Sequence, residues 1–265
     1  MKVLELFAGT RSIGKAFEAK GHEVYSIEWD KQFENIDLYA DIMTVTAEQI
    51  IKEFGRPDII WASPDCTTYS VAAISKHRHK EPNGHLTPKT QYATFCDMVN
   101  EHVVELIKEL DPKYWFIENP VGGLRKMNFM QELPRYTVTY CQYGERRQKP
   151  TDIWTNHPNP QFKPPCKRGA SCHDAAPRGS KSGTQALKNA IEKSKIPVML
   201  CEHIVDISEE EYRECDLCGA LMHEGYCIHG GEEYYCSDDC LYAVYSESEY
   251  EELCEQDVAY WTQWL

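Results

Sequence analysis

Short apolar runs alternate with helical segments along the first half of the chain, and this alternation most constrains its fold. The runs typical of buried strands lie at 2–6, 22–27, 58–62 and 114–117. Apolar residues spaced as on one face of a helix predict helices between them, at 13–20, 47–54 and 92–110. Strands that alternate with helices form a mostly parallel sheet with helices on both faces. The sequence therefore predicts an α/β fold.

The second half of the body departs from this alternation. Two further strand-like runs, 136–140 and 152–155, have no long helix between them, which favours an antiparallel pair at the sheet edge. Residues 157–183 are rich in Pro, Gly, Ser and Lys, and we expect a long surface excursion there. A helix at 196–207 is expected to close the body.

The charge of the chain is unevenly distributed. The formal net charge is −14, but residues 202–265 hold 18 Asp and Glu against a single Arg, which leaves the first 201 residues at +3. The body can therefore present a basic groove to nucleic acid, whereas the acidic C-terminal segment is better suited to a protein partner.

Neither a membrane span nor a secretory leader is evident from the sequence. No run of about 18 apolar residues occurs, and the first residues lack the layout of a signal peptide. We expect a cytoplasmic, DNA-associated protein without a membrane partner. In that compartment the 12 cysteines are expected to serve metal binding or catalysis rather than disulfides.

Glycine and acidic residues follow the first strands, where parallel sheets bind their ligands. A Gly9 turn follows the first strand, Glu28-Trp29 follows the second, and Asp41 follows a short extended stretch. Such acids can bind ribose hydroxyls or an adenine amino group, and Trp29 can pack on the adenine. A simple turn with two solvated acids is the alternative, but the combination favours a nucleoside cofactor.

A cysteine and an acid follow the next two strands. Cys66 lies in the turn after 58–62, and Glu118-Asn119 follows 114–117, so both are expected at the mouth of the same crevice. A lone cysteine is more often inert. A nucleophilic thiol beside a carboxylic acid nevertheless suits attack on an electron-poor ring whose nitrogen needs a proton.

Taken in order, these motifs resemble those of the DNA cytosine-5 methyltransferase family over about the first 207 residues. The matching segments are Phe7-Ala8-Gly9, Glu28, Asp41, Pro64-Asp65-Cys66, Glu118-Asn119, Tyr143-Gly144, the run 146–149 and the helix motif at 196–200. The resemblance implies a Rossmann-like fold that binds S-adenosylmethionine. It also implies that Cys66 attacks carbon 6 of cytosine while Glu118 hydrogen-bonds ring nitrogen 3.

The resemblance assigns two sets of site residues. The catalytic set is Cys66, Glu118, Asn119 and Lys149, with Arg147 as an alternative to Lys149 for holding the phosphate or the base. The cofactor set is Phe7, Gly9, Thr10, Ser12, Glu28, Trp29, Asp41, Ile42 and Pro64. The partner is then DNA, with the target cytosine flipped out or unpaired, because this chemistry cannot reach a base inside a duplex.

Three features differ from the family pattern. Asp65 replaces the proline that usually precedes the nucleophile, and an inward-facing acid there would raise the pKa of the thiol. Arg11 and Ser12 replace glycines of the cofactor turn. No large target-recognition domain is present, so the excursion 157–183 is the remaining segment for that role. Basic residues in it and in a loop at 76–80 could contact phosphates.

The C-terminal segment has the cysteine spacing of a zinc site. Cys215-x2-Cys218 and Cys236-x3-Cys240 flank a Gly-rich hairpin, and two such pairs provide the four thiolates of tetrahedral zinc. We therefore expect a methyltransferase domain at 1–207 and an acidic zinc-binding module at 208–265. Cys141, Cys166, Cys172 and His173 could form a second site, although free loop cysteines are the more common arrangement.

Two other functions fit the same residues. One is methylation of cytosine in tRNA, as in a compact branch of the family. The other is a non-catalytic regulator that keeps the fold and binds protein through its zinc module. Retention of both Cys66 and Glu118 favours an enzyme.

Overall fold

The computed structural model describes residues 1–167, 169–174 and 189–264. It divides into two compact units, Met1–Val205 and Asp206–Leu265, with the boundary inside helix α7 (Val198–Glu209). The sequence-based boundary at residue 207 lies within the same helix.

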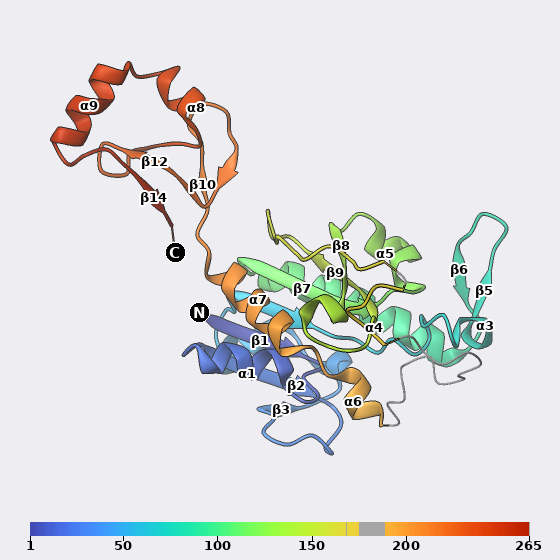
Figure 1. Ribbon diagram of the computed structural model, residues 1–265. Helices are drawn as coiled ribbons and strands as arrows, with labels where there is room; N and C mark the ends of the chain where they lie inside the picture. The colour runs from blue at the N-terminus through green and yellow to red at the C-terminus, as the bar shows by residue number, and fades with distance from the viewer. Residues whose placement is uncertain (168, 175–188, 265) are drawn as a thin grey trace. The chain divides into compact units, whose positions relative to one another are not determined.

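A seven-stranded sheet forms the centre of the first unit (Figure 1). Six of its strands run in one direction, and β9 is antiparallel to its neighbours β7 and β8. This confirms the mostly parallel sheet with an antiparallel pair at one edge. In spatial order the strands are β3 (Leu38–Tyr39), β2 (Glu23–Glu28), β1 (Lys2–Leu6), β4 (Ile59–Ala62), β7 (Tyr114–Pro120), β9 (Pro150–Thr155) and β8 (Arg135–Thr139).

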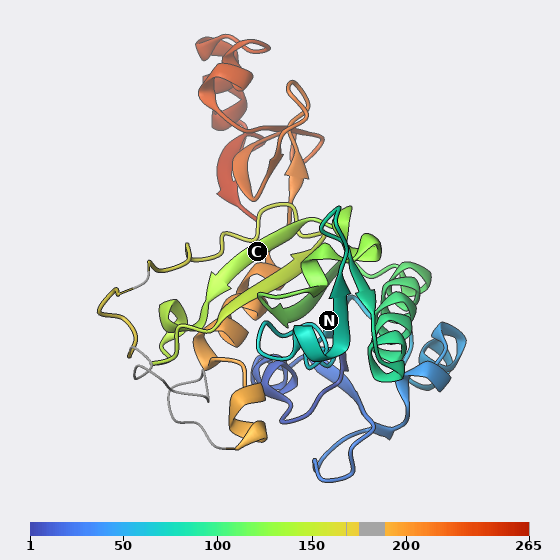
Figure 2. The ribbon, with the colours of Figure 1, turned by 90° about the vertical axis from the view of Figure 1, so that its right-hand side faces the viewer.

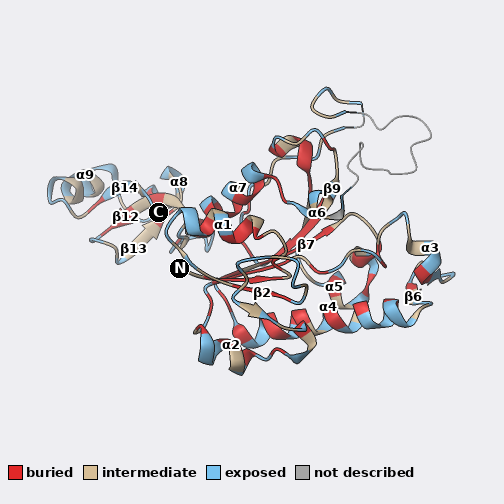
Figure 3. Ribbon diagram, turned by 90° about the horizontal axis from the view of Figure 1, so that it is seen from below, coloured by how far each residue is buried: buried red, intermediate tan, exposed pale blue. Residues whose placement is uncertain are grey.

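Helices cover both faces of this sheet. Figure 3 shows α1 (Ser12–Ala19) and α7 on one side, and α2 (Ala47–Glu53) and α4 (Gln91–Leu110) on the other, with buried strands between them. Two of these helices begin where a threonine caps them: the hydroxyls of Thr46 and Thr90 accept backbone N–H bonds from the first turns of α2 and α4. The predicted α/β architecture is confirmed.

A small hairpin follows the Cys66 turn; it projects from the body at the right of Figure 1 and faces the viewer in Figure 2. It consists of β5 (Arg78–Lys80) and β6 (Leu86–Pro88), and α3 (Ile74–His77) precedes it. The loop expected at 76–80 is therefore ordered secondary structure. Arg78 is only 4% exposed, and its guanidinium donates to Asp97 and Thr68. It supports the hairpin and is not available to a phosphate.

The remaining elements of this unit are short. They are η1 (Ile42–Thr44), η2 (Leu124–Lys126), α5 (Asn128–Gln131), η3 (Tyr140–Tyr143) and α6 (Ala190–Ser194). The described part of the excursion, 157–167 and 169–174, contains no helix or strand. Its expected phosphate contacts Arg168, Arg178 and Lys181 lie outside the described residues.

The second unit has a small core of its own around a three-stranded antiparallel sheet. The elements are β10 (Arg213–Glu214), β11 (Leu221–Met222), β12 (Glu224–Ile228), β13 (Glu233–Tyr235), α8 (Asp238–Tyr242), α9 (Glu247–Glu255) and β14 (Tyr260–Gln263). Six buried side chains make up the core, which is little for 60 residues. Among the described residues of either unit, no helix has the length and apolar character needed to cross a membrane.

Candidate active site

A pocket of about 400 Å³ opens beside the ends of β1 and β2. Five residues of the expected cofactor set line it: Phe7, Glu28, Trp29, Asp41 and Ile42. Trp29 is 70% exposed, so its ring is accessible for stacking at the pocket edge. The volume is within the range of small-molecule sites, and the aromatic and acidic lining fits a nucleoside.

Glu28 is fixed by the backbone around it. One carboxylate oxygen accepts an N–H bond from Gly9 at 3.0 Å, and the other accepts from Trp29 at 2.9 Å and Asp30 at 3.0 Å. Gly9 reaches this carboxylate because its φ is +49°, in the left-handed region that favours glycine. Phe7 adopts φ +56° in the same turn, a conformation uncommon for a bulky residue and often found at functional sites.

The other four residues of the expected cofactor set, Gly9, Thr10, Ser12 and Pro64, do not line the pocket. The hydroxyls of Thr10 and Ser12 hydrogen-bond each other at 2.9 Å. Pro64 is buried, and its carbonyl accepts a bond from the Asn119 amide. These residues shape the two turns.

The opposite wall comes from α4, which the sequence reading did not include in the site. Tyr92, Phe95, Cys96, Val99 and Asn100 line the pocket from this helix. Tyr92 and Phe95 are 42% and 43% exposed, unlike the core residues of the helix. Two aromatic residues three positions apart in the first turns of the predicted helix, Tyr92 and Phe95, were the sequence signal that could have indicated this wall.

Cys66 lies in the turn after β4, next to Asp65 of the pocket wall. Burial, the Glu118 carboxylate and the Asp65 carboxylate together raise the pKa of the Cys66 thiol to about 11, against the opposing effect of Lys149. The Asp65 carboxylate therefore raises the pKa of the Cys66 thiol, as expected, but its effect is smaller than those of burial and of Glu118. The hydroxyl of Tyr92 donates to Asp65 and holds it.

A buried polar group faces this thiol from the antiparallel part of the sheet. Glu118 near the end of β7 is 6% exposed and accepts a bond from the Tyr140 hydroxyl at 2.9 Å. Lys149 Nζ lies 3.6 Å from the same carboxylate oxygen and 3.2 Å from the Tyr140 hydroxyl. Tyr140 is fully buried, and burial followed by the Glu118 charge raises the pKa of its hydroxyl, so it stays a donor. The sequence reading missed Tyr140.

Comparison with known proteins shows the family of the chain. A family model described as C-5 cytosine-specific DNA methylase matches residues 1–139. A curated relative from Frog virus 3 (isolate Goorha), described as "Probable DNA (cytosine-5)-methyltransferase", is 30% identical over 161 residues, which are 59% of this chain and 71% of the relative. The chain belongs to the C-5 cytosine-specific DNA methylase family.

Solved structures are more distant. The S. pombe Dnmt2 methyltransferase is 14% identical with a TM-score of 0.40, and 58% of this chain covers 48% of it. The Entamoeba histolytica methyltransferase EhMeth is 14% identical with a TM-score of 0.43, and 58% of this chain covers 52% of it. The chain thus spans about half the length of these solved proteins.

The cofactor of this methylase family is S-adenosylmethionine, and the pocket fits it. Glu28 accepts three backbone N–H bonds, so about one of its roughly four lone-pair sites is left for a ribose hydroxyl. Asp41 also lines the pocket, and one of its oxygens accepts the Met43 N–H.

Asn119 occupies a supporting position in the methylase site. It is 1% exposed, and its side-chain nitrogen donates to the Pro64 carbonyl at 2.9 Å. This bond ties the end of β7 to the turn that carries Cys66. The side-chain oxygen of Asn119 is buried and has no hydrogen-bond partner among the described residues.

Of the two cations considered for holding the target, Lys149 is in the site and Arg147 is not. Arg147 pairs with Glu145 through two nitrogens and donates to the Lys193 carbonyl. Lys149 points at Glu118 from a backbone with φ +22°, just before Pro150, a strained conformation for a lysine.

A second, basic pocket of about 600 Å³ lies under the β5–β6 hairpin. Exposed Lys80, Lys89 and Lys126 line it together with Arg125, whose guanidinium is bound to Asp152. Lys80 belongs to the basic run expected at 76–80, whereas Lys89 and Lys126 lie outside it.

The second unit brings the four expected zinc ligands together. The sulfur atoms of Cys215, Cys218, Cys236 and Cys240 all lie within 4.8 Å of one another. Burial raises the pKa of Cys215, but backbone N–H groups of Cys218, Cys236 and Leu217 outweigh it and lower the pKa to about 6. A cradle of N–H donors around a thiolate is typical of zinc knuckles, so the residues fit the metal.

Proposed function

We propose that this protein transfers a methyl group from S-adenosylmethionine to carbon 5 of cytosine in DNA. The observation that carries the proposal is the position of Cys66. Its neighbour Asp65 forms part of the wall of the cofactor pocket, and its thiol is close enough to the buried Glu118 carboxylate for that charge to raise the pKa of Cys66. A base held between them would contact nucleophile and acid at once.

The proposed reaction begins at the thiol. Cys66, as thiolate, forms a bond to carbon 6, and the electron pair of the ring double bond moves to carbon 5. The cofactor supplies the electrophilic methyl group. Carbon 5 then loses its proton, the double bond re-forms, and Cys66 leaves as thiolate. Burial makes the resting thiol reluctant to ionise, so Lys149 is needed nearby as a counter-charge.

Glu118 is proposed to donate a proton to ring nitrogen 3. Tyr140 and Lys149 both engage Oε1, which leaves Oε2 for the base. The Tyr140 hydroxyl and the Lys149 ammonium group offset the negative charge that develops on the ring as the thiolate attacks. Because both groups are fixed before the reaction, they need not reorganise. Lys149 therefore acts on the base through Glu118 in this proposal.

DNA is the proposed partner, with the target cytosine outside the duplex. Support comes from the family and from Lys80, Lys89 and Lys126 around the basic pocket. The described excursion, 157–167 and 169–174, is proposed as the target-recognition segment. The acidic unit is proposed to bind one zinc ion through its four cysteines and to serve a protein partner.

A trapping experiment tests the function. DNA that contains 5-fluorocytosine should form a stable conjugate with the wild-type protein and S-adenosylmethionine, because fluorine blocks the final elimination. The conjugate should be absent with Cys66→Ser and present with Cys96→Ser, which alters the other cysteine of the pocket region. A conjugate that persists in Cys66→Ser would refute the nucleophile. Trapping by fluorocytosine RNA but not by DNA would favour the tRNA alternative.

A further inference from the structure

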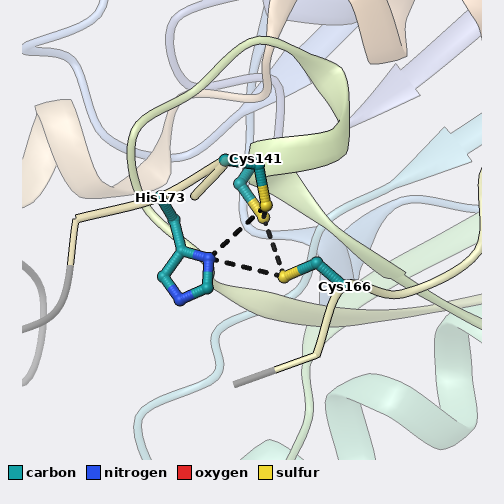
Figure 4. Close-up of side chains that lie close together, drawn as sticks. Cys141, Cys166 and His173 are labelled. Carbon is teal, nitrogen blue, oxygen red and sulfur yellow. Dashed lines mark hydrogen bonds between the residues drawn. The ribbon is translucent and has the colours of Figure 1, made fainter. Parts of the chain in front are cut away.

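Four potential metal ligands meet in the first unit, away from the cofactor pocket. Figure 4 shows Cys141, Cys166 and His173 pointing toward one another, and Cys172 joins them. Cys141 belongs to η3, while the other three come from the excursion, which has no helix or strand there. Their ligand atoms all lie within 4.8 Å of one another.

The distances resemble the edges of a tetrahedron around one ion. Two sulfur pairs are separated by 3.1 Å (Cys141 to Cys166) and 3.6 Å (Cys141 to Cys172). His173 Nδ1 lies 3.6 Å from Cys166 Sγ and 3.5 Å from Cys172 Sγ. Zinc–sulfur bonds of about 2.3 Å in tetrahedral geometry give edges of roughly 3.8 Å, so small shifts would place all four ligands on one ion.

A second observation concerns the surroundings of the sulfur atoms. Gln148 Nε2 donates to Cys166 Sγ at 3.3 Å, and Gln142 Nε2 donates to Cys172 Sγ at 3.4 Å. The backbone N–H of Cys166 is held by the Thr139 hydroxyl at 2.9 Å. Side-chain amides aimed at sulfur stabilise thiolates, and such outer contacts orient the ligands of metal sites. Ordinary reduced loop cysteines have no need of them.

We propose that Cys141, Cys166, Cys172 and His173 bind one structural zinc ion within the catalytic unit. Three thiolates and one imidazole form a closed four-ligand set of the soft type that zinc prefers. On binding, each thiol releases its proton to solvent and the imidazole stays neutral, so no oxidant or reductant takes part.

The position of this site gives the ion a role in catalysis that rests on the proposed function. Tyr140, which bonds Glu118, directly precedes Cys141, and Gln148 directly precedes Lys149. The Tyr140 N–H also bonds the Gln148 carbonyl at 3.0 Å. The ion would therefore fix both residues that hold Glu118.

The same ion would anchor the excursion. Arg146 pairs with Asp174 through two nitrogens, and the Asp174 N–H bonds the Arg146 carbonyl at 2.9 Å. These exposed contacts alone are weak. A metal one residue away at His173 converts them into a fixed connection between the proposed recognition segment and the catalytic turn.

Elemental analysis of the full-length protein provides the direct test. We expect about two zinc ions per chain, one for each four-ligand set. The double variant Cys215→Ser/Cys218→Ser, which disables the C-terminal site, should retain one. Cys254→Ser, outside both clusters, should retain two. Loss of all zinc in the double variant would overturn the proposal, and this result does not depend on folding of any variant of the new site.

Cobalt substitution tests the ligand set in the same double variant. The intensity of the sulfur-to-cobalt charge-transfer band should correspond to three thiolate ligands. When His173→Cys is added to the Cys215→Ser/Cys218→Ser variant, the intensity should rise to the value expected for four thiolate ligands. An unchanged spectrum in His173→Cys would rule out His173 as a ligand. A mass lower by two hydrogens, located to a Cys141–Cys166 disulfide, would overturn the proposal as well.

Kinetics separate this proposal from the proposed function. His173→Ala should lower kcat at least tenfold while the calorimetric affinity for S-adenosylmethionine stays within twofold, because the cofactor pocket has no residue from this cluster. Two zinc ions in a wild-type protein that never methylates cytosine would support the metal site and refute the function. Unchanged kcat in zinc-free His173→Ala would refute the role of the ion in fixing Tyr140 and Lys149.

Discussion

Cys66, the proposed nucleophile, lies where its ionised form is disfavoured. Burial, Glu118 and Asp65 all raise the pKa of the thiol, and Lys149 opposes them. Such a thiol is largely protonated near neutral pH and stays protected from adventitious alkylation and oxidation. In the proposed reaction Glu118 takes up a proton from solvent as the base binds, before it donates that proton to ring nitrogen 3, and in the protonated form it no longer raises the pKa of Cys66 through its charge. Activation of the thiol is thereby coupled to the presence of substrate.

Asp65 offers a measurable test of this electrostatic description. Asp65→Asn removes a negative charge that raises the pKa of Cys66, so at pH 8 the thiolate fraction should increase and iodoacetamide should label Cys66 roughly two- to threefold faster. Tyr92→Phe, which removes the hydroxyl bound to Asp65 but no charge, is the matched control. Labelling that slows in Asp65→Asn would mean that Asp65 does not act on the thiol through its charge.

Glu118 and Glu28 should separate chemistry from cofactor binding. Glu118→Gln should lower kcat by roughly two to four orders of magnitude with little change in cofactor affinity, because its role arises in the transition state. Glu28→Ala should chiefly weaken the binding of S-adenosylmethionine in calorimetry, and Glu23→Ala, an exposed acid of the same strand, should change neither quantity. Wild-type affinity in Glu28→Ala would refute the ribose role.

Among the elements, β1 and α1 are joined by a buried acid. Glu5 of β1 is 2% exposed, and one of its oxygens accepts the Ile13 N–H at the start of α1 at 3.2 Å. The other oxygen has no hydrogen-bond partner among the described residues. Burial raises the pKa of Glu5 to about 7, with smaller opposing effects from the Gly14 N–H and Arg11.

This pKa makes the link between β1 and α1 sensitive to pH. Because the folded-state pKa is raised, the favourable contribution is complete below the unfolded value of about 4.5 and is lost as pH rises through 7. Between pH 5.5 and 8.5, the free energy of unfolding of Glu5→Gln should therefore increase relative to wild type by roughly 2 kcal/mol. Chemical denaturation at both pH values measures it. The exposed control Glu23→Gln should show no such trend, and a flat difference for Glu5→Gln would contradict the raised pKa.

Elements with a regular pattern were predictable from the sequence, and contacts between distant segments were not. The strands and the helix α4 follow from apolar periodicity, and the ends of β1, β2 and β4 locate Glu28 and Cys66. Tyr140 could not be found this way, since its role depends on β7, β8 and β9 being neighbours. The candidate second metal site of Cys141, Cys166, Cys172 and His173 was named from the sequence, but its geometry was not predictable, because His173 meets Cys141 only after the excursion folds back. The pocket wall formed by α4 was not predicted, because the apolar spacing of this helix was interpreted only as packing against the sheet.

For the molecule as a whole, the two units differ in size, charge and source of stability. The first has a large apolar core, whereas the second has a core cluster of six buried residues and a four-cysteine cluster. Metal is thus expected to supply much of the folding free energy of the second unit only. A chelator should unfold the second unit well before the first loses its sheet.

A shortened chain that ends at Glu209, the last residue of α7, tests this division. It should bind S-adenosylmethionine with unchanged affinity, because every residue lining the pocket precedes residue 101. Its affinity for DNA in fluorescence anisotropy at low salt should be unchanged or higher, since a segment that repels phosphate is gone. The full-length Cys215→Ser/Cys218→Ser variant separates loss of metal from loss of charge. A folded short chain that no longer binds DNA would place the acidic unit in the recognition surface.

The uneven charge also bears on how such an enzyme finds its targets. A body with formal charge +3, carrying an appendage of opposite sign, is held only weakly by DNA of arbitrary sequence. Weak retention shortens the stay at each wrong position, so more positions are sampled in a given time. The acidic residues of the C-terminal segment would then speed the search for target sites along a long DNA molecule without contacting the DNA themselves.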